Sequence, residues 1–285
     1  MQGNRQREGR PAGNPRILAP ACGQWHAPAV ASARIVSLVP SSTESVCDLG
    51  AGARLVGCTR YCTEPQDQLA AVVRVGGTKN PQRERIAALQ PDLVLANAEE
   101  NRAEDIAWLR ARFAVLEQTP RSVVAAAAAL RELAERLLAL DAAQPFLLRI
   151  EAQLAAAAAG NLDREPVPVF YAIWKKPWMS VNRDTFVHDV LRVAGAHNVC
   201  ADASARYPEV AAEAVVAERP AIVLLPSEPW AFSAAERDEL ASARTFGAAQ
   251  LLLCDGRDFC WHGTRMADGL GRAAELVSRA RASRR

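Results

Sequence analysis

The chain has 285 residues, half of them apolar and 23% charged, and its formal net charge is +2. This composition is typical of a globular protein with room for two modest cores, and the charge is too small to indicate nucleic-acid binding. No apolar run approaches the roughly 18 residues that a membrane-spanning helix needs.

The first 33 residues are expected to lie outside the folded part. Arginines among Gly, Pro and Asn open the chain, which is typical of a disordered tail. The segment from Ile17 to Ala33 carries no formal charge and ends in Ala-Ser-Ala, like an export-signal cleavage site, but Pro20 and Pro28 interrupt its apolar part. Residues 1–33 are therefore either a disordered tail or a degenerate signal.

Residues 34–120 alternate between apolar runs and helical patterns. The apolar runs predict strands at 35–39, 55–58, 93–95 and from 115 onward. Helices are expected between them: Ser41 and Glu44 have the spacing of a capping box, Gly50 supplies a helix stop, and Asn101 can cap a later helix. This alternation predicts a mostly parallel sheet, and therefore an α/β lobe.

The segment 121–160 is dominated instead by alanine and leucine, which favour helices. Asp141 marks a new helix start, with Pro145 in the first turn. Two successive helices, 122–140 and 142–159, are therefore expected. A helical connector of this kind limits the relative motion of its flanking lobes far more than a flexible linker does.

Residues 161–285 repeat the alternation of the first lobe. Strands are expected at 167–173, 222–225 and 251–254, and helices at 184–194 and 265–282. No glycine-rich phosphate fingerprint follows a strand, so a nucleotide cofactor is not expected. The predicted fold class is α/β, with two Rossmann-like lobes at 34–120 and 161–285. Each lobe has a central, mostly parallel sheet, and a long helical connector at 121–160 joins them.

Two segments, more than a hundred residues apart, share one pattern. In each, a glutamate (Glu84 or Glu213) opens a short helical pattern, a proline follows seven residues later, and a compact apolar strand comes next. An acidic residue in a first helical turn is favoured by about 0.3–1 kcal/mol, which explains either glutamate alone. Their matched positions in two lobes indicate a partner that contacts both lobes at once.

The chain has seven cysteines, an odd number, without a Cys-x-x-Cys motif. Free cysteines near strands behave as small hydrophobic residues. The count indicates a protein that lives with reduced thiols and not a disulfide framework. Pairing of Cys58 with Cys62 is the less favoured alternative.

Aromatic side chains occur in the predicted loops, where neither helical nor strand periodicity places them: Tyr61, Trp174, Trp178, Tyr207, Phe259 and Trp261. Local loop packing explains any one of them. As a group they predict a cleft lined by flat side chains, which suits a large planar or apolar ligand.

The histidines offer less chemistry. His188 and His197 fall in or near a helical pattern, and only His262 lies in an aromatic loop. The four histidines lack the close His/Asp/Glu spacing of a metal site, so no directly coordinated metal is expected. Cys260 and His262 are too close along the chain to face each other well as nucleophile and base.

Five motifs then point to a family: Arg34-Ile-Val-Ser-Leu-Val-Pro-Ser-Ser-Thr-Glu44, Val75-Gly-Gly-Thr-Lys-Asn-Pro81, Leu89-Gln-Pro-Asp-Leu-Val94, Tyr207-Pro-Glu-Val210 and Leu225-Pro-Ser-Glu228. With them the chain resembles the periplasmic substrate-binding proteins with a helical backbone (class III), and most closely the vitamin B12 (cobalamin) binding branch. The resemblance implies two α/β lobes joined by one long helix, a ligand between them, and delivery of that ligand to an ABC importer.

The resemblance also implies roles for particular residues. One surface glutamate per lobe docks on permease arginines, and these glutamates match Glu84 and Glu213. The ligand-binding positions match Pro40, Ser41, Tyr61, Trp178, Tyr207 and Trp261. The chain departs from the family at Thr78-Lys79-Asn80, where members carry an aromatic residue, and in lacking a clear signal peptide.

The sequence therefore predicts a monomeric, non-enzymatic protein that binds a corrinoid or a related metal chelate, such as haem or a siderophore. Its partner is an ABC importer permease, and no catalytic residue, cofactor or nucleic acid is expected. The family implies the periplasm, while the cysteines and the missing signal leave the cytoplasm open. The alternatives are a tetrapyrrole enzyme such as a chelatase, using His262 and Glu228, and a cytosolic chelate carrier without a transporter.

Overall fold

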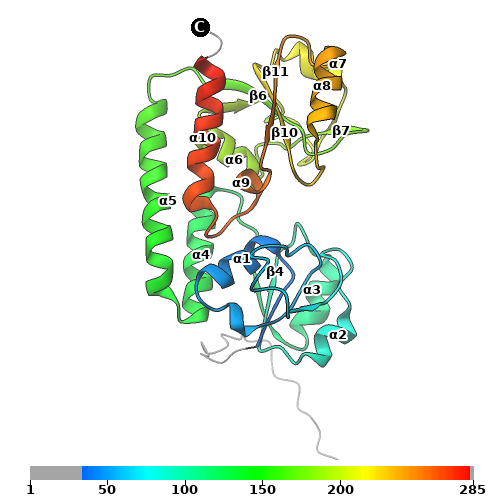
Figure 1. The fold of residues 1–285 in the computed structure, drawn as a ribbon, viewed down its shortest axis with the longest axis vertical. Helices are drawn as coiled ribbons and strands as arrows, with labels where there is room; N and C mark the ends of the chain where they lie inside the picture. The colour runs from blue at the N-terminus through cyan, green and yellow to red at the C-terminus, as the bar shows by residue number, and fades with distance from the viewer. Residues whose placement is uncertain (1–33, 283–285) are drawn as a thin grey trace, which may run out of the picture.

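Two lobes lie one above the other, and long helices run along one side of the molecule (Figure 1). The structure is a computed structural model that describes residues 34–282. The expected tail or signal at 1–33 lies outside the described residues. The fold class is α/β with two parallel sheets, so the predicted fold class is confirmed.

The first lobe contains a five-stranded parallel sheet in the order β3-β2-β1-β4-β5. Its strands are β1 (Ile35–Ser37), β2 (Leu55–Cys58), β3 (Val73–Arg74), β4 (Leu93–Ala96) and β5 (Ala114–Glu117). Its helices are α1 (Pro40–Asp48), the 3-10 helix η1 (Gly52–Arg54), α2 (Arg83–Ala88) and α3 (Ala103–Arg110).

Helices cover both faces of this sheet, which explains why its central strands are continuous apolar runs. Successive side chains of a strand point to opposite faces. Ile35 and Leu95 therefore join the cluster that includes residues of α1 and of α4 (Val123–Leu137). Val36 and Val94 join the opposite cluster, with residues of α2 and α3.

Two predicted helix caps are wrong. The first helix begins at Pro40 after Val39, without a side-chain cap and without the Ser41–Glu44 capping box, since proline already suits the first helical position. Asn101 does not cap α3 either, because the residue at that position is Arg102. Instead, the side-chain oxygen of Asn101 accepts a hydrogen bond from the backbone nitrogen of Asn97, 2.9 Å away.

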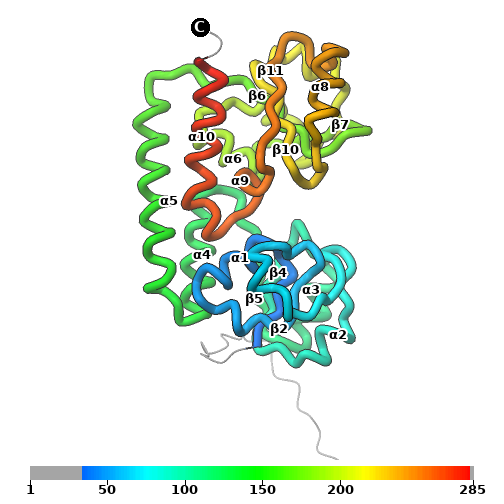
Figure 2. The backbone as a smooth tube through the Cα atoms, viewed as in Figure 1, coloured from blue at the N-terminus to red at the C-terminus, as the bar shows by residue number. Residues whose placement is uncertain are grey.

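The helical layer consists of α4, α5 (Leu140–Asn161) and α10 (Met266–Ala282). The hydroxyl of Ser122 caps α4, and Leu138 ends it in a left-handed conformation. With 22 residues, α5 is about 33 Å long, and it runs past both lobes beside α4 and α10 (Figure 2). The two predicted helices therefore exist, although α5 starts at Leu140 and encloses Pro145.

The second lobe contains a four-stranded parallel sheet in the order β11-β10-β6-β8 and a small antiparallel pair, β7-β9. The strands are β6 (Val167–Tyr171), β7 (Trp178–Met179), β8 (Ala196–Asn198), β9 (Glu209–Val210), β10 (Ile222–Pro226) and β11 (Gln250–Cys254). The helices are α6 (Phe186–Val193), α7 (Ala212–Ala217), α8 (Ala234–Ser242) and α9 (Arg257–Cys260).

A close contact joins α1 of the first lobe to the turn between α9 and α10. The backbone nitrogen of Thr264 donates to the hydroxyl of Ser45 at 3.1 Å, and the Thr264 hydroxyl donates to Asp48 at 2.6 Å. Gly263 has φ +104°, and a Cβ there would overlap the hydroxyl of Ser45. Only glycine fits this close approach while the Ser45 hydroxyl stays where Thr264 bonds it.

We expect Gly263→Ala to lower the free energy of unfolding by roughly 1–3 kcal/mol, because the added methyl group meets both an unfavourable φ and a neighbouring side chain. Gly160→Ala is the matched control, since nothing lies within 4 Å of its added Cβ inside α5. It should be neutral or slightly stabilising. Urea unfolding measures the stability of both variants. Equal unfolding midpoints would show that the structure around Gly263 accommodates the added methyl group at no cost.

Candidate ligand-binding site between the lobes

Segments that follow the carboxyl ends of strands in one lobe contact segments of the other. In open parallel α/β sheets, ligands bind outside these strand ends. We call the following set the interlobe junction: residues 59–64, 76–80 and 97–101 of the first lobe, and 206–207, 227–229 and 255–261 of the second.

Ion pairs cross the junction at two points. The guanidinium of Arg257 lies 3.2 Å from the carboxylate of Glu64. That of Arg206 lies 2.8 Å from Glu99 and 3.3 Å from Asp184. Partly exposed pairs of this kind contribute at most about 1 kcal/mol each, so they orient the lobes more than they stabilise them.

Tyr207 presents an aromatic ring at the junction and is 39% exposed. Burial of its hydroxyl, and then the nearby carboxylate of Glu99, with which it shares a hydrogen bond, raise the pKa of Tyr207 above its ordinary value. The hydroxyl therefore stays protonated at neutral pH. It can donate to Glu99 while the ring remains available to a ligand.

Glu100 is a half-buried carboxyl group in the middle of this region. Its burial raises the pKa of Glu100 to about 8, with further contributions from the negative charges of Cys62 and Glu228. The ammonium group of Lys79 opposes the shift without cancelling it. At neutral pH, Glu100 is therefore largely uncharged and can donate a hydrogen bond as well as accept one.

Glu228 organises the second-lobe side of the junction. Its carboxylate accepts hydrogen bonds from the indole nitrogen of Trp261 and, at 3.1 Å, from the thiol of Cys260. Trp261 is only 6% exposed, and the guanidinium groups of Arg257 and Arg265 lie 5.9 and 5.4 Å from its ring centroid. Trp261 therefore acts as a packed anchor and offers little free ring surface.

The other predicted aromatic residues differ in exposure. Tyr61 is 50% exposed, and the guanidinium of Arg60 lies 5.1 Å from its ring centroid. Trp178, on β7, is half-buried; its ring stacks on Phe232 and meets Phe246 edge-on, at centroid distances of 6.1 and 4.9 Å. Tyr61, Tyr207 and Trp174 are thus the most exposed of the predicted aromatic residues, and the ring of Trp174 meets that of Trp230 edge-on, with centroids 4.9 Å apart.

Pro40 and Ser41 lie at the buried start of α1. The carbonyl oxygen of Ser41 accepts a hydrogen bond from the Ser45 hydroxyl at 2.9 Å, beside the turn that contains Gly263. Their side chains face protein atoms, so any contribution to ligand binding comes through the N-terminal end of the helix.

Glu84 and Glu213 occupy the exposed first turns of α2 and α7. These two helices belong to different lobes and lie on the side of the molecule away from α5 (Figure 1). Neither carboxylate forms an ion pair within residues 34–282, which leaves both available to a partner.

His262 and Glu228, the pair expected of a chelatase, are not in hydrogen-bond contact within residues 34–282. Burial lowers the pKa of His262 to about 4, and its Nε2 atom has no partner among the described residues. Burial, followed by the Glu228 charge, raises the pKa of Cys260 well above its ordinary value. The imidazole is therefore neutral and the thiol protonated at neutral pH.

Sequence analysis missed most of the charged residues at the junction: Glu64, Glu99, Glu100, Arg206 and Arg257. A usable signal existed for Glu99 and Glu100, which lie three and four residues beyond the end of β4. Residues just beyond a parallel strand's carboxyl end are placed at the ligand-binding edge by topology alone. Arg206 carries no such signal, since it lies in a long irregular loop.

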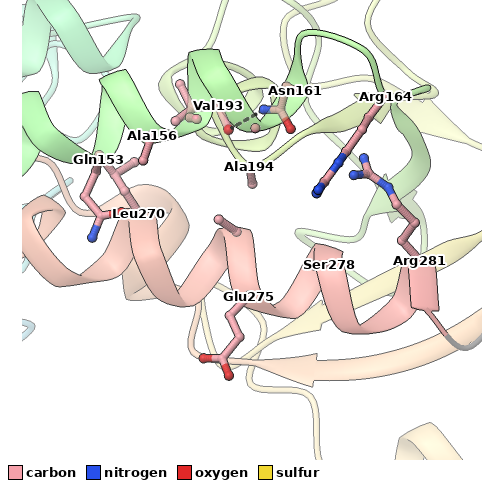
Figure 3. A pocket seen from close by; sticks show the side chains of 13 residues that line it. Gln153, Ala156, Asn161, Arg164, Val193, Ala194, Leu270, Glu275, Ser278 and Arg281 are labelled. Carbon is pink, nitrogen blue, oxygen red and sulfur yellow. Dashed lines mark hydrogen bonds between the residues drawn. The ribbon is translucent and has the colours of Figure 1, made fainter.

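A separate pocket of about 320 Å³ lies between α5 and α10, beside the end of α6 (Figure 3). Small residues such as Ala156 and Ala194 line it, and Arg164 and Arg281 lie together at one end. The side-chain amide of Asn161 donates to the carbonyl of Val193 at 3.1 Å on its wall. None of these residues belongs to the interlobe junction.

Residues 34–282 contain no group of His, Cys, Asp and Glu side chains arranged to hold a metal ion. Over the same residues, none of the helices combines the length and the apolar character required to cross a bilayer.

Two parallel α/β lobes, flanked by a helical layer and facing each other across the strand ends, define a two-lobed binding protein. The periplasmic binding protein family matches residues 35–248, and the chain belongs to this family.

Similar proteins cover most of the chain. The vitamin B12-binding protein of Vibrio campbellii is 28% identical over 191 residues, which span 67% of this chain and 69% of that protein. The periplasmic vitamin B12 binding protein BtuF of Vibrio cholerae has a similar structure, with a TM-score of 0.77 and 21% identity. The match covers 88% of this chain and 98% of that protein. The periplasmic heme-binding protein RhuT of Roseiflexus sp. RS-1 is also similar in structure, with a TM-score of 0.73 and 24% identity. The match covers 87% of this chain and 99% of that protein.

We expect Glu100→Gln to stabilise the protein at alkaline pH. The folded protein holds the Glu100 proton up to about pH 8, whereas an ordinary glutamate releases it near 4.5. The stability that this proton provides is complete below pH 4.5 and is lost as the pH rises through 8. Glutamine never ionises, so the free energy of unfolding of the variant should rise relative to that of wild type as the pH increases from about 5 to about 9.

Thermal unfolding at several pH values measures this gain. About 1 kcal/mol moves the melting temperature of a chain of this size by roughly 2–4 °C. Glu104→Gln, at an exposed position on α3, is the control and should follow wild type. A constant difference between Glu100→Gln and wild type across this pH range would contradict the assignment.

Proposed function

We propose that this protein binds a corrinoid between its lobes and delivers it to an ABC importer. The observation that carries the proposal is the similarity to vitamin B12-binding proteins over two thirds of the chain, together with the matching two-lobed fold. Haem is the second candidate, because proteins with this fold include a heme-binding protein. A periplasmic location and a monomeric state are proposed on the same resemblance.

The junction offers partners for both candidate ligands. A corrinoid carries uncharged amide groups on its rim, whereas haem carries two anionic propionates. Glu99 and Glu228 can accept hydrogen bonds from amides, and Arg206 and Arg257 at the same junction could pair with propionates. Haem iron takes an axial His, Cys, Met or Tyr ligand, and the exposed Tyr61 and Tyr207 could serve as one, which keeps haem as the second candidate.

The proposed role is binding without chemistry. A neutral, buried His262 and a protonated Cys260 make a poor base and a poor nucleophile. A binding protein returns its ligand unchanged, so corrinoid extracted after incubation should keep its absorbance spectrum. A spectrum that shows loss or exchange of the central metal would favour the chelatase alternative.

We expect Tyr61→Ala and Tyr207→Ala each to weaken corrinoid binding by roughly 1–3 kcal/mol, or about 5- to 150-fold, because an exposed ring would be lost from the ligand surface. Tyr207→Phe should cost less, since it removes only the hydrogen bond with Glu99. Titration with cyanocobalamin, and separately with haemin, followed by intrinsic fluorescence, measures the affinities.

Leu148→Ala is the control for this series, since it removes an exposed apolar side chain from α5. Trp178→Ala is a less clean test, because the loss of stacking on Phe232 would also destabilise the second lobe. Full affinity in both Tyr→Ala variants would mean that the ligand binds elsewhere.

The matched glutamates support the transport half of the proposal. Exposed carboxylates on two lobes can form bidentate pairs with arginines of a permease, which fix orientation as well as contributing energy. Because Glu84 and Glu213 are exposed in first helical turns, each contributes at most about 1 kcal/mol to folding.

The double variant Glu84→Ala/Glu213→Ala should therefore bind ligand normally, melt close to wild type, and fail to deliver corrinoid to an importer reconstituted in vesicles. The matched control is Glu135→Ala/Glu151→Ala, which removes exposed carboxylates from α4 and α5 on the opposite side. Uptake of labelled cobalamin is the measurement. Normal uptake with the Glu84/Glu213 variant would exclude these residues as the docking contacts.

A further inference from the structure

Cys58 and Cys62 stand at either end of the turn that carries Tyr61. Cys58 is the last residue of β2, and the backbone nitrogen of Cys62 closes the turn by donating to the carbonyl of Thr59 at 3.2 Å. Both cysteines are fully buried, and one guanidinium nitrogen of Arg74 lies 2.8 Å from the sulfur of Cys58 and 2.7 Å from the carbonyl oxygen of Cys62. The fold therefore places Cys58 and Cys62 close together, which the number of cysteines alone does not predict.

Polar groups surround these sulfurs and distinguish them. Arg74 donates to the sulfur of Cys58 at 2.8 Å. The hydroxyl of Thr43 donates to the sulfur of Cys62 at 3.1 Å, and that of Thr59 lies 3.2 Å from it. The hydrogen bond from Cys58 lowers the pKa of Cys62 to about 7, burial opposes this, and the two threonines assist.

The same surroundings tolerate loss of the thiol protons. Arg74 keeps hydrogen bonds to the carbonyl oxygens of Thr59 and Cys62, at 3.2 and 2.7 Å, whatever the state of the sulfurs. The hydroxyl of Thr43 keeps its bond to the carbonyl of Val39 at 3.0 Å. Arg74 and Thr43 therefore keep acceptors when a sulfur–sulfur bond forms, and only the buried hydroxyl of Thr59 relies on the sulfur of Cys62 staying within reach.

We propose that Cys58 and Cys62 form a disulfide bond that closes the Tyr61 turn when the protein meets a thiol–disulfide oxidant. The thiolate of Cys62 attacks one sulfur of the oxidant's disulfide, and the other sulfur leaves as a thiolate that takes up a proton. Cys58 then attacks the Cys62 sulfur and releases the second oxidant thiol. Two protein thiols are oxidised, and one disulfide is reduced to two thiols.

The turn is the natural point of access for this exchange. Its central residues, Arg60 and Tyr61, are exposed, while the sulfurs lie beneath them. The oxidant reaches Cys62 when the turn opens or before the lobe has closed during folding. In an oxidising compartment the bond then persists, and the base of Tyr61 is fixed covalently beside the interlobe junction.

Trypsin provides a direct test, because Arg60 lies between the two cysteines. Cleavage after Arg54, Arg60 and Arg74 gives the peptides 55–60, with Cys58, and 61–74, with Cys62. The full chain is reduced, unfolded and refolded with oxidised and reduced glutathione. Remaining thiols are then blocked with N-ethylmaleimide, and the protein is digested without reductant and analysed by mass spectrometry.

The expected result is a single species that joins peptides 55–60 and 61–74, lighter than their sum by two hydrogen atoms, and separated by a reductant. Cys58→Ser and Cys62→Ser should each abolish it, and Cys200→Ser, at another buried cysteine, should leave it unchanged. Separate, maleimide-labelled peptides from the folded wild type would overturn the proposal.

Two further outcomes would also overturn it. One is glutathione retained on Cys62, which would show that Cys58 does not complete the exchange. The other is a link between peptides 35–54 and 61–74, which would assign the bond to Cys47 instead. Because the readout involves no ligand, failure of this proposal would leave the corrinoid-binding proposal untouched, and the converse also holds.

Discussion

The arrangement of the two lobes depends on the ion pair between Glu44 of α1 and Arg265, just before α10. Both side chains are nearly buried, at 13% and 14% exposure, and the guanidinium contacts both carboxylate oxygens, at 3.1 and 2.9 Å. Burial raises the pKa of Glu44 despite this partner. Loss of Arg265 would therefore leave a nearly buried carboxylate without a compensating charge, which destabilises the fold. Because Arg265 also approaches Asp258 at 3.5 Å, the pair ties α1 to α9 as well as to α10.

The same ion pair explains where prediction from sequence succeeded and where it failed. The strand at 55–58 was placed correctly because it is an apolar run bounded by turns. The capping box was not, since Glu44 is used by a partner over two hundred residues away, and local spacing contains no information about such a contact. Strands of two or three residues, such as β7 and β9, are too short to show a period.

The site residues also show which properties can be predicted from local sequence and which depend on distant contacts. Loop position identified Tyr61 and Tyr207, whose rings are exposed, but it could not distinguish them from Trp261, whose ring is held by Glu228 and two arginines. Periodicity describes how a residue relates to its own element. Exposure at the junction depends on which segments the parallel topology brings together, and that is a property of the whole chain.

The large apolar cluster runs without interruption from Ile35 in the first sheet, through Leu147 of α5, to Leu224 in the second sheet and Val277 of α10. Each lobe therefore buries one face of its sheet against helices that it shares with the other. A fragment ending before α4 would leave Ile35 and Leu95 facing water. The remaining fragment, from α4 onward, would lack a continuous core. The two lobes are thus halves of one cooperative folding unit, and neither could be exchanged between relatives without its share of the helical layer.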